Sequence, residues 1–430
     1  MNPALLAARR PVVTGLGFIT PIGNDRAAVA ASLRAGRHGL APVEFLGNPA
    51  LPVKVAGTVK EFDVSSTNSR DWSWPARYDI PRETLRGLAP HGVYALCAIE
   101  QALADAALAP AAIAHQPDTG LFCASAGSAR MLHHHLGQMD AARGERGNPM
   151  GVVSSICGTL NFNLGAHFHI TGAVCGFVSA CASSSHALGY ACDEIRLGRL
   201  RRVIVVGAEE PNAESILPFA AMRALSAQSD PALASCPFDA ARNGFVGAGG
   251  AVALIIEAAE LAHERGAPVL AEIAGWGQSA DGHSVAMSHP EGAGLRLAMQ
   301  RALADAGVAV GEIDYVNAHA TSTPVGDRAE ALALRAVFAE AGARPRVSST
   351  KGLTGHPLSM AGAMEAAFCS LALAEGFIPG NAHLRTPDPV CDGLDLPRET
   401  LAVAPRLVLN NSSGFGGSNV CHVLRRADRA

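Results

Sequence analysis

Residues 174–208 read VCGFVSACASSSHALGYACDEIRLGRLRRVIVVGA, and this stretch decides which fold the chain adopts. A β-rich run at 174–180 leads into a predicted helix at 181–197, in which apolar residues recur at helical spacing. Gly198, directly after that helix, is typical of a helix C-terminus, and a second β-rich run follows at 203–208. Strand, helix and strand in this order predict an α/β protein with mostly parallel central strands.

A second unit with the same layout lies nearer the C-terminus. A β-rich run at 347–350 leads through a glycine-containing turn into a predicted helix at 359–375, and a further strand is expected at 407–411. Because the two units match in order, we expect two similar halves, residues 1–257 and residues 258–430. Four more strands are expected at 12–16, 119–124, 252–257 and 315–318.

The composition indicates a large core of small side chains. Of the 430 residues, 49% are hydrophobic but only 5% are aromatic, which is typical of a globular chain and not of a disordered one. A net charge of -4 exerts no general attraction on nucleic acid, so no nucleic-acid partner is expected. The ten cysteines include no CxxC pair, and we expect most of them to be small buried thiols.

No segment is expected to enter a membrane. No window approaches the run of about 18 uninterrupted apolar residues that a membrane helix needs. The opening residues, MNPALLAARRPVVTGLG, contain an apolar stretch too short for a secretory signal. We therefore expect a soluble, cytoplasmic protein without a membrane partner.

Cys181 differs from the other cysteines because it opens the predicted helix, within SACASSSH at 179–186. Free backbone N–H groups and the positive end of a helix stabilise a thiolate at such a position. The small neighbouring side chains would let a substrate reach the sulfur. A structural cysteine at a crowded helix start fits the same pattern equally well.

Three later segments carry further candidate catalytic groups. His319 lies in NAHATSTPVGD at 317–327, after a predicted strand whose end can present a side chain to a pocket. Lys351 and His356 lie among glycines in STKGLTGHP at 349–357, and Lys351 is one of only three lysines in the chain. The glycine-rich NNSSGFGGSN at 410–419 offers backbone N–H groups to an oxyanion. Each feature alone also fits a structural role.

In order and in context, these segments together resemble the β-ketoacyl-[acyl-carrier-protein] synthase family, and the resemblance spans nearly the whole chain. VTGLG at 13–17, PFD at 237–239 and RNGFV at 242–246 contribute to it. A Cys-His-His set resembles the elongating synthases, whereas the initiating type has Asn as its second group. SACASSSHALG and GFVGAGGA look most like the type I enzymes.

The resemblance implies a thiolase-like five-layer αβαβα fold and an acyltransferase activity. An acyl thioester held on Cys181 would undergo decarboxylative Claisen condensation with malonyl-acyl-carrier-protein, giving 3-oxoacyl-acyl-carrier-protein in fatty-acid or specialised polyketide or polyene synthesis. No metal and no cofactor is expected, because the substrates arrive on the phosphopantetheine of acyl carrier protein. The resemblance also implies a homodimer, while a heterodimer with a related subunit stays open.

Specific roles follow from the same resemblance. His319 and His356 would stabilise negative charge on the malonyl thioester oxygen, and Lys351 would support decarboxylation with Glu330 as its partner. The backbone N–H groups of Cys181 and Phe415 would form the oxyanion hole, and the hydroxyls of Thr321 and Thr323 would hold the pantetheine arm. The resemblance also implies that Phe245 and Phe415 are aromatic gates and that Arg82 and Arg86 contact the carrier protein. Ordinary surface arginines explain Arg82 and Arg86 equally well, since Glu83 interrupts the basic run.

Several positions depart from the usual family pattern. Ala320 replaces Gly, Ser413 replaces a common Phe, and Pro357 with Met360 alters the segment after His356. Residues 68–78 look like an insertion, while ASAG at 124–127 resembles the floor of the acyl tunnel and predicts room for a chain there. The departures leave acyl-chain length and pathway open.

Other functions fit less of the sequence. A chain-length factor, a non-catalytic partner subunit with the same fold, lacks the nucleophile, as does a stand-alone malonyl decarboxylase, whereas this chain has Cys181. A thiolase uses a second cysteine in its C-terminal glycine-rich loop, which here reads GFGG at 414–417. The HHH run at 133–135 lacks a second spaced cluster of ligands and is not expected to bind a metal.

Overall fold

The computed structural model describes residues 9–427, and within them ten strands form one mixed sheet. Residues 1–8, on which part of the expectation about a secretory signal rests, lie outside the described residues. The strands of the sheet are β1 (Pro11–Ile19), β4 (Thr119–Ala124), β5 (Val174–Phe177), β6 (Arg202–Glu209), β7 (Gly250–Ala258), β8 (Ala271–Ala280), β9 (Tyr315–Asn317), β10 (Arg346–Ser348), β11 (Leu407–Gly414) and β12 (Ser418–Arg425). A separate small pair consists of β2 (Leu40–Pro42) and β3 (Val55–Gly57).

The helices cover both faces of this sheet. They are α2 (Arg26–Ala35), α3 (Arg82–Leu85), α4 (Pro90–Asp105), α5 (Ala129–Ala141), α6 (Gly151–Ser155), α7 (Leu160–His167), α8 (Ser183–Arg196), α9 (Ala213–Ile216), α10 (Pro231–Ala234), α11 (Ala259–Glu264), α12 (Ala293–Ala306), α13 (Pro324–Leu334), α14 (Lys351–Thr354) and α15 (Ala361–Glu375).

The large sheet consists of two halves with the same topology. Its strand order is β10-β9-β11-β12-β8-β1-β7-β6-β4-β5, and only a two-residue pairing joins β8 to β1. In one half β4 is parallel to β5 and β6, while β7 is antiparallel to β6 and β1. In the other half β9 is parallel to β10 and β11, while β12 is antiparallel to β11 and β8. The two halves therefore match strand for strand, and the boundary after residue 257 stays a prediction.

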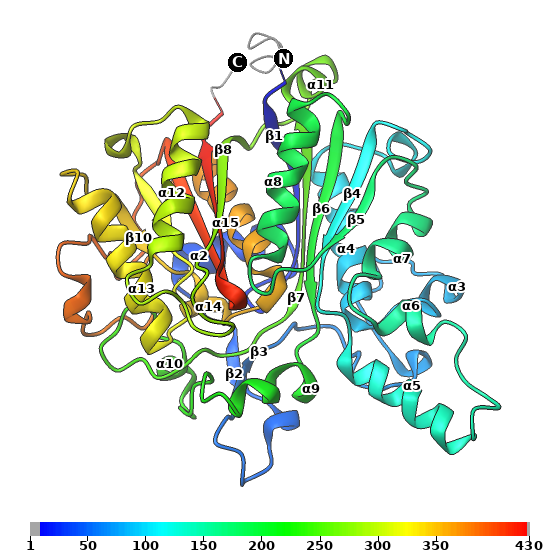
Figure 1. Ribbon diagram of the computed structural model, residues 1–430. Coiled ribbons are helices and arrows are strands. Elements are labelled where there is room, and N and C mark those ends of the chain that lie inside the picture. Colours follow the sequence, from blue (N-terminus) through cyan, green and yellow to red (C-terminus); the bar gives the residue numbers. More distant parts are fainter. Residues whose placement is uncertain (1–8, 428–430) are drawn as a thin grey trace.

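The elements stack in five layers, which confirms the predicted thiolase-like fold (Figure 1). α4 and α7 cover the outer face of the first half, α12 and α13 cover that of the second, and α8 with α15 fills the middle. In β6, Val203 and Val205 face the middle layer, whereas Ile204 and Val206 face the outer layer. Burial of both faces explains why this run is continuously apolar and does not alternate with polar residues.

Small side chains let α8 and α15 approach closely in the middle layer. A Cβ atom added to Gly362 of α15 would lie only 1.9 Å from Ser185 Oγ of α8. The Ser184 hydroxyl accepts a hydrogen bond from the backbone N–H of Ala363, and Ser185 Oγ donates to Ser412 Oγ of β11 at 2.6 Å. This packing holds the start of α8, from the first half, against strands of the second half.

The predicted elements are present, most of them with shifted ends, whereas β4 has the predicted bounds. The helix expected at 181–197 begins at Ser183, and the helix expected at 359–375 begins at Ala361 after a short 3-10 turn. The insertion-like residues 68–78 pack Trp72 and Tyr78 into the core beneath α4. All ten cysteines are free and most of them are buried, as expected.

One helical stretch within residues 9–427, Leu358–Glu375, is long and apolar enough to cross a membrane. However, 83% of it is buried inside the protein, as in the core helix of a soluble protein. Its hydrophobicity is explained by its place in the middle layer, where it contacts both halves of the sheet.

Candidate active site

The candidate catalytic groups lie at the carboxyl ends of neighbouring parallel strands. β10, β9 and β11 are adjacent and parallel, so their carboxyl ends meet at one edge of the sheet. His319 follows β9, Lys351 begins α14 after β10, and Phe415 follows β11. Cys181 comes from the first half, between β5 and α8, and the middle layer brings it to the same edge.

Cys181 lies in a tight turn two residues before α8 begins. Ala180 has a φ of 50°, a left-handed conformation that residues with side chains rarely adopt. The Ser183 hydroxyl stabilises this turn by accepting a hydrogen bond from Ser179 N at 2.8 Å and donating one to Ala180 O at 2.6 Å. The expectation that the helix begins with the cysteine was therefore wrong, because the turn separates Cys181 from the first helical residue.

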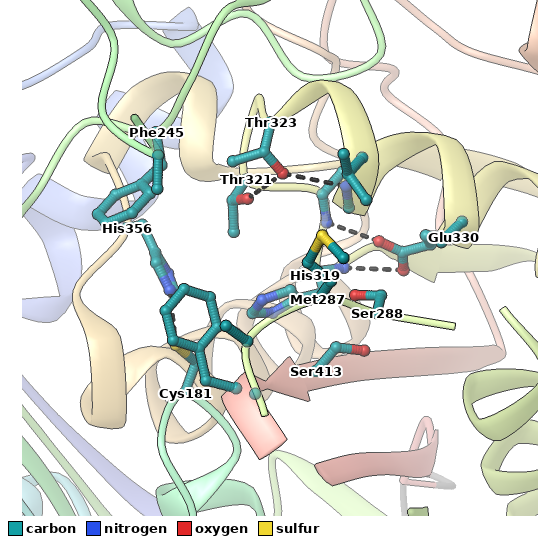
Figure 2. Close-up of a pocket in the computed structure, with 18 of the residues that line it drawn as sticks. Cys181, Phe245, Met287, Ser288, His319, Thr321, Thr323, Glu330, His356 and Ser413 are labelled. Carbon is teal, nitrogen blue, oxygen red and sulfur yellow. Dashed lines mark hydrogen bonds between the residues drawn. The ribbon is translucent and has the colours of Figure 1, made fainter. Parts of the chain in front are cut away.

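The structure brings Cys181, His319 and His356 together around one chamber (Figure 2). Cys181 Sγ lies 3.0 Å from His356 Nε2. The rings of His319 and His356 are almost perpendicular, with centroids 5.2 Å apart. The chamber has a volume of about 340 Å³, and its lining is mainly apolar. A thioester in this space can contact the sulfur and both imidazoles at once.

Burial keeps the thiol and the imidazoles neutral. It raises the pKa of the Cys181 thiol to about 12, although Lys351 and nearby N–H groups act to lower it. Burial and the positive charge of Lys351 hold the pKa values of His319 and His356 well below 6.5. The thiolate expected from the sequence is therefore not the resting form, because desolvation outweighs the neighbouring cation and the helix end. A neutral His356 can accept the thiol proton when the sulfur attacks.

The turn that carries Phe415 packs against the turn that carries Cys181, the two residues whose N–H groups the sequence analysis assigned to the oxyanion hole. The backbone N–H groups of Phe415 and Cys181 act to lower the pKa of the Cys181 thiol, although burial outweighs them. A side chain on Gly414 would collide with this turn, since its Cβ would lie 2.8 Å from Ser179 O. Glycine at this position thus lets the two segments approach, and two N–H groups here suit an oxyanion on the carbon bonded to Sγ.

Lys351 is fully buried and forms an ion pair with Glu365 of α15. Burial raises the pKa of the Glu365 carboxyl to about 7, while Lys351 acts to lower it. The predicted partner, Glu330, was wrong, since the carboxylate that meets Lys351 comes from α15 and not from α13.

Glu330 instead holds the loop that carries His319. Its carboxylate accepts hydrogen bonds from the backbone N–H groups of His319 at 2.9 Å and Ala320 at 2.7 Å, and from Asn411 Nδ2 at 3.0 Å. Three donors from two segments fix the backbone beside the imidazole, so Glu330 positions His319 through its main chain.

Thr321 and Thr323 line the chamber next to His319, and their role in holding the pantetheine arm stays a prediction. Their Oγ1 atoms lie 3.2 Å apart. Thr323 Oγ1 also accepts the N–H of Gly326 and thereby caps α13. Its position is therefore fixed by the helix start, and both hydroxyls face the space that a substrate would enter (Figure 2).

Three phenylalanines enclose the chamber near His356. The ring of Phe245 meets that of His356 edge to face, with centroids 5.3 Å apart. Phe219 contacts both Phe245 and Phe415 edge to face, at 5.3 and 5.8 Å. Of the two gates named from the sequence, Phe415 is 37% exposed and Phe245 only 4% exposed, so Phe415 is the more accessible.

Glu365 and Phe219 were not predicted from the sequence. Glu365 carries a recognisable signal, because it is the only charged residue between 357 and 374 in an otherwise apolar helix. Phe219 lies in a short irregular segment without periodicity, so only the tertiary contacts reveal it. Among the departures from the family pattern, Ala320 and Ser413 line the chamber, whereas Met360 is buried in the middle layer.

The structure does not bring every predicted residue to this chamber. Arg82 and Arg86 are exposed at α3, and Arg86 lines a different cavity together with His134 and His135. Residues 124–127, expected to floor an acyl tunnel, do not line the chamber either, and Ala126 N instead donates to Glu209 at 3.1 Å. Within residues 9–427 no group of three or more His, Cys, Asp or Glu side chains is placed to hold a metal ion.

Comparisons with known proteins agree with this geometry. The family description "Beta-ketoacyl synthase, N-terminal domain" matches residues 8–262, and "Beta-ketoacyl synthase, C-terminal domain" matches residues 270–385. The 3-oxoacyl-[acyl-carrier-protein] synthase 1 of Escherichia coli (strain K12) is 37% identical over 424 residues, which is 97% of this chain and 99% of that protein.

Two solved structures show the same fold over 98% of this chain and all of theirs. A β-ketoacyl synthase from Burkholderia phymatum STM815 has a TM-score of 0.89 at 32% identity. A structure described as the ishigamide ketosynthase/chain length factor has a TM-score of 0.86 at 29% identity. With both family domains, full-length relatives and the Cys-His-His chamber in agreement, this chain belongs to the β-ketoacyl synthase family.

Proposed function

We propose that this protein is an elongating β-ketoacyl synthase that joins an acyl group to a malonyl unit with loss of carbon dioxide. The observation that carries the proposal is the 3.0 Å contact between Cys181 Sγ and His356 Nε2, in a chamber that His319 also lines. One nucleophile beside two neutral imidazoles serves both acyl transfer and the stabilisation of an enolate.

In the first step the acyl group moves from its carrier thioester to Cys181. His356 Nε2 accepts the thiol proton while Sγ forms a bond to the acyl carbon. The bond from that carbon to the carrier sulfur breaks, and the carrier thiolate takes the proton. The N–H groups of Phe415 and Cys181 bind the oxyanion of the tetrahedral intermediate, and loss of one such donor typically costs about 10²–10³ in rate.

In the second step malonyl-carrier enters the same chamber. The bond between malonyl C2 and its carboxylate breaks, carbon dioxide leaves, and the electron pair forms an enolate whose oxygen is held by His319 and His356. Lys351 supplies positive potential that favours this negative charge. C2 then bonds to the acyl carbon, the bond to Cys181 Sγ breaks, and one proton from solvent restores the thiol. The product is a 3-oxoacyl thioester on the carrier.

The substrates would reach the chamber on the phosphopantetheine arm of an acyl carrier protein. Thr321 and Thr323 would hold this arm, and Phe245 with Phe415 would gate the way to Cys181. Arg82 and Arg86 would receive the acidic carrier surface. Because the arm delivers both substrates, the reaction needs no metal and no further cofactor, and we place it in the cytoplasm, with residues 1–257 and 258–430 as its two units.

A second candidate is a non-catalytic subunit of the chain-length-factor type. The likeness to a structure described as a ketosynthase/chain length factor favours it. The two candidates differ in whether Cys181 becomes acylated, which transfer from a panel of acyl-carrier thioesters measures directly by intact mass. The same panel identifies the preferred chain length.

We further propose that two copies form a homodimer through β5. This strand ends the large sheet, and its residues are exposed or only partly buried. Val174 and Val178 on or beside it are 36% and 68% exposed, and Phe162 of the adjacent α7 is 56% exposed. An unpaired edge flanked by apolar side chains suits pairing with its own copy across a two-fold axis.

Replacing the nucleophile is the first test. The Cys181→Ala variant should lose condensation by more than about 10⁴-fold, because no acyl-enzyme can form, yet retain some malonyl decarboxylation. Intact mass should show an acyl adduct on the unaltered protein and none on the variant, and Cys157→Ala serves as a control that keeps the adduct. Condensation by Cys181→Ala, or an unaltered protein that no acyl-carrier modifies, contradicts the proposal.

The buried lysine gives a second test. Lys351→Ala should slow carbon dioxide release from malonyl-carrier by about 10²-fold or more, because the positive potential beside the enolate is lost. Lys351→Ala leaves Glu365 buried without its partner and could therefore unfold the protein. A double variant, Lys351→Met with Glu365→Gln, removes both charges and so distinguishes an effect of the missing positive charge from an effect of unfolding. The exposed Lys60→Ala is the matched control. Carbon dioxide release at the usual rate in both Lys351 variants would overturn the assigned role.

The raised thiol pKa predicts how the free enzyme responds to pH. Because burial lifts the pKa of Cys181 to about 12, the thiol is protonated at neutral pH and its thiolate fraction grows as pH rises. Alkylation of Cys181 by iodoacetamide should therefore accelerate about tenfold per pH unit between about pH 7 and 9. A rate that is independent of pH over this interval would show that a thiolate is already present.

The dimer is tested by placing charge on the exposed edge. Val174→Lys combined with Val178→Lys should convert dimers to monomers, because like charges would meet across the two-fold axis. Light scattering reads the mass, and circular dichroism checks that the variant is folded. Val403→Lys, at a site 45% exposed elsewhere on the surface, should leave the dimer intact. An unaltered protein that is monomeric alone but dimeric with a related subunit would support a heterodimer instead.

A further inference from the structure

The chamber extends from the catalytic groups in two directions. On one side lie Phe219, Phe245 and Leu358, which border Cys181 and His356. On the other side the chamber reaches a recess beyond His319. We define this recess by its lining residues, which are Ser288, Gly292, Leu295, Ala329, Ser413 and Asn419. Leu295 and Ala329 are each only 4% exposed, so the recess penetrates the packed layer beneath α12 and α13.

The recess exists because Ser413 is small. Successive side chains of β11 point to opposite faces of the sheet. Ser412 accepts a hydrogen bond from the Ser185 hydroxyl in the middle layer, so its neighbour Ser413 faces the outer layer. There its hydroxyl donates to Asn419 Oδ1 at 2.7 Å. Asn419 Nδ2 in turn donates to Asp281 Oδ1 at 2.8 Å, which fixes both side chains against the wall. A phenylalanine ring at position 413 would fill the space that the serine leaves open.

The chemistry of the recess favours a short, uncharged group. Its depth is formed by Leu295, Ala329 and the backbone of Gly292. Two carboxylates line the chamber, Glu330 and Asp281. Glu330 already accepts three N–H donors, and the two oxygens of Asp281 accept Asn419 Nδ2 and the N–H of His289, so neither carboxylate is left free to bind a cation. The Ser413 hydroxyl and the Asn419 amide are likewise engaged with each other. An apolar group in the recess therefore breaks no hydrogen bond of the lining residues, and it buries apolar surface of the wall.

The position of the recess identifies which substrate would use it. Figure 2 shows Ser288 and Ser413 beside His319, on the side of the chamber away from Phe245 and His356. Thr321 and Thr323 lie on the His319 side as well, so in the proposed function the extender's arm enters there. The stored acyl chain, in contrast, leaves Cys181 among the phenylalanines. Between its thioester and its carboxylate the extender has one carbon that can bear a substituent, namely C2.

We propose that this recess accepts a short alkyl substituent on C2 of the malonyl unit, so that the enzyme makes 2-alkyl-3-oxoacyl products. The step balances as it does for malonyl: the bond from C2 to the carboxylate breaks, carbon dioxide leaves, and C2 with its substituent bonds to the acyl carbon. Met287 borders the recess and is 57% exposed, so its flexible side chain can adjust to the added group. This inference rests on the proposed condensation.

The test compares malonyl-carrier with 2-methylmalonyl-carrier on acylated enzyme, and mass spectrometry identifies the product. The unaltered protein should use both, with kcat/KM values within about tenfold of each other. Ser413→Phe should lower the ratio of kcat/KM for methylmalonyl to that for malonyl by about 10- to 100-fold, as expected when a pocket for one small group is filled. Ala329→Leu, which fills the recess from α13, should lower the ratio in the same direction.

Val285→Phe is the matched control, because Val285 is 88% exposed on the neighbouring loop and does not line the chamber. Its ratio should equal that of the unaltered protein. If the unaltered protein condenses malonyl but not methylmalonyl, or if Ser413→Phe and Ala329→Leu both keep the original ratio, the inference is wrong while the condensation stands. If malonyl itself gives no product and Cys181 takes up no acyl group, the proposed function fails instead.

Discussion

The site depends on how closely α8 packs against α15 in the middle layer. Gly362 allows contact with Ser185, and the hydroxyls of Ser184 and Ser185 bind groups of the second half of the protein. Without this approach the turn that carries Cys181 would not reach the strand ends that carry His319 and His356. The abundance of small side chains in the sequence therefore has a functional consequence, because bulkier residues would separate the nucleophile from the imidazoles.

Electrostatics in the chamber follow from the same packing. Excluding water from the middle layer raises the pKa of the Cys181 thiol and lowers those of the two histidines, so the resting site holds neutral groups around one buried cation, Lys351. Glu365 partly balances that cation, and its carboxyl pKa of about 7 reflects the low polarity around it. Such a chamber stabilises negative charge that develops only in the transition state. Stabilisation of the transition state, and not of the bound substrate, is what accelerates the reaction.

Much of the fold and of the site could be predicted from the sequence. β4 has the predicted bounds, since both of its ends coincide with changes in composition. Cys181, His319 and His356 were recognised in their motifs and do meet in one chamber. The start of α8 was misplaced because the left-handed Ala180 leaves no trace in residue type, as alanine normally continues a helix. The partner of Lys351 was misassigned because choosing between Glu330 and Glu365 requires knowing which helix packs against α14.

The sequence alone predicted most strands of the large sheet but not β8 or β12, and it predicted the repeated order of strand and helix and the chemical identity of the reactive groups. These follow from local pattern and residue type, which act over a few neighbouring positions. Only the tertiary structure decided that the sulfur is protonated, that Glu330 holds a loop and not the lysine, and that Ser413 opens a recess. Each of these depends on distances between segments remote in the chain, and burial and Coulomb interactions are set by those distances and not by sequence separation.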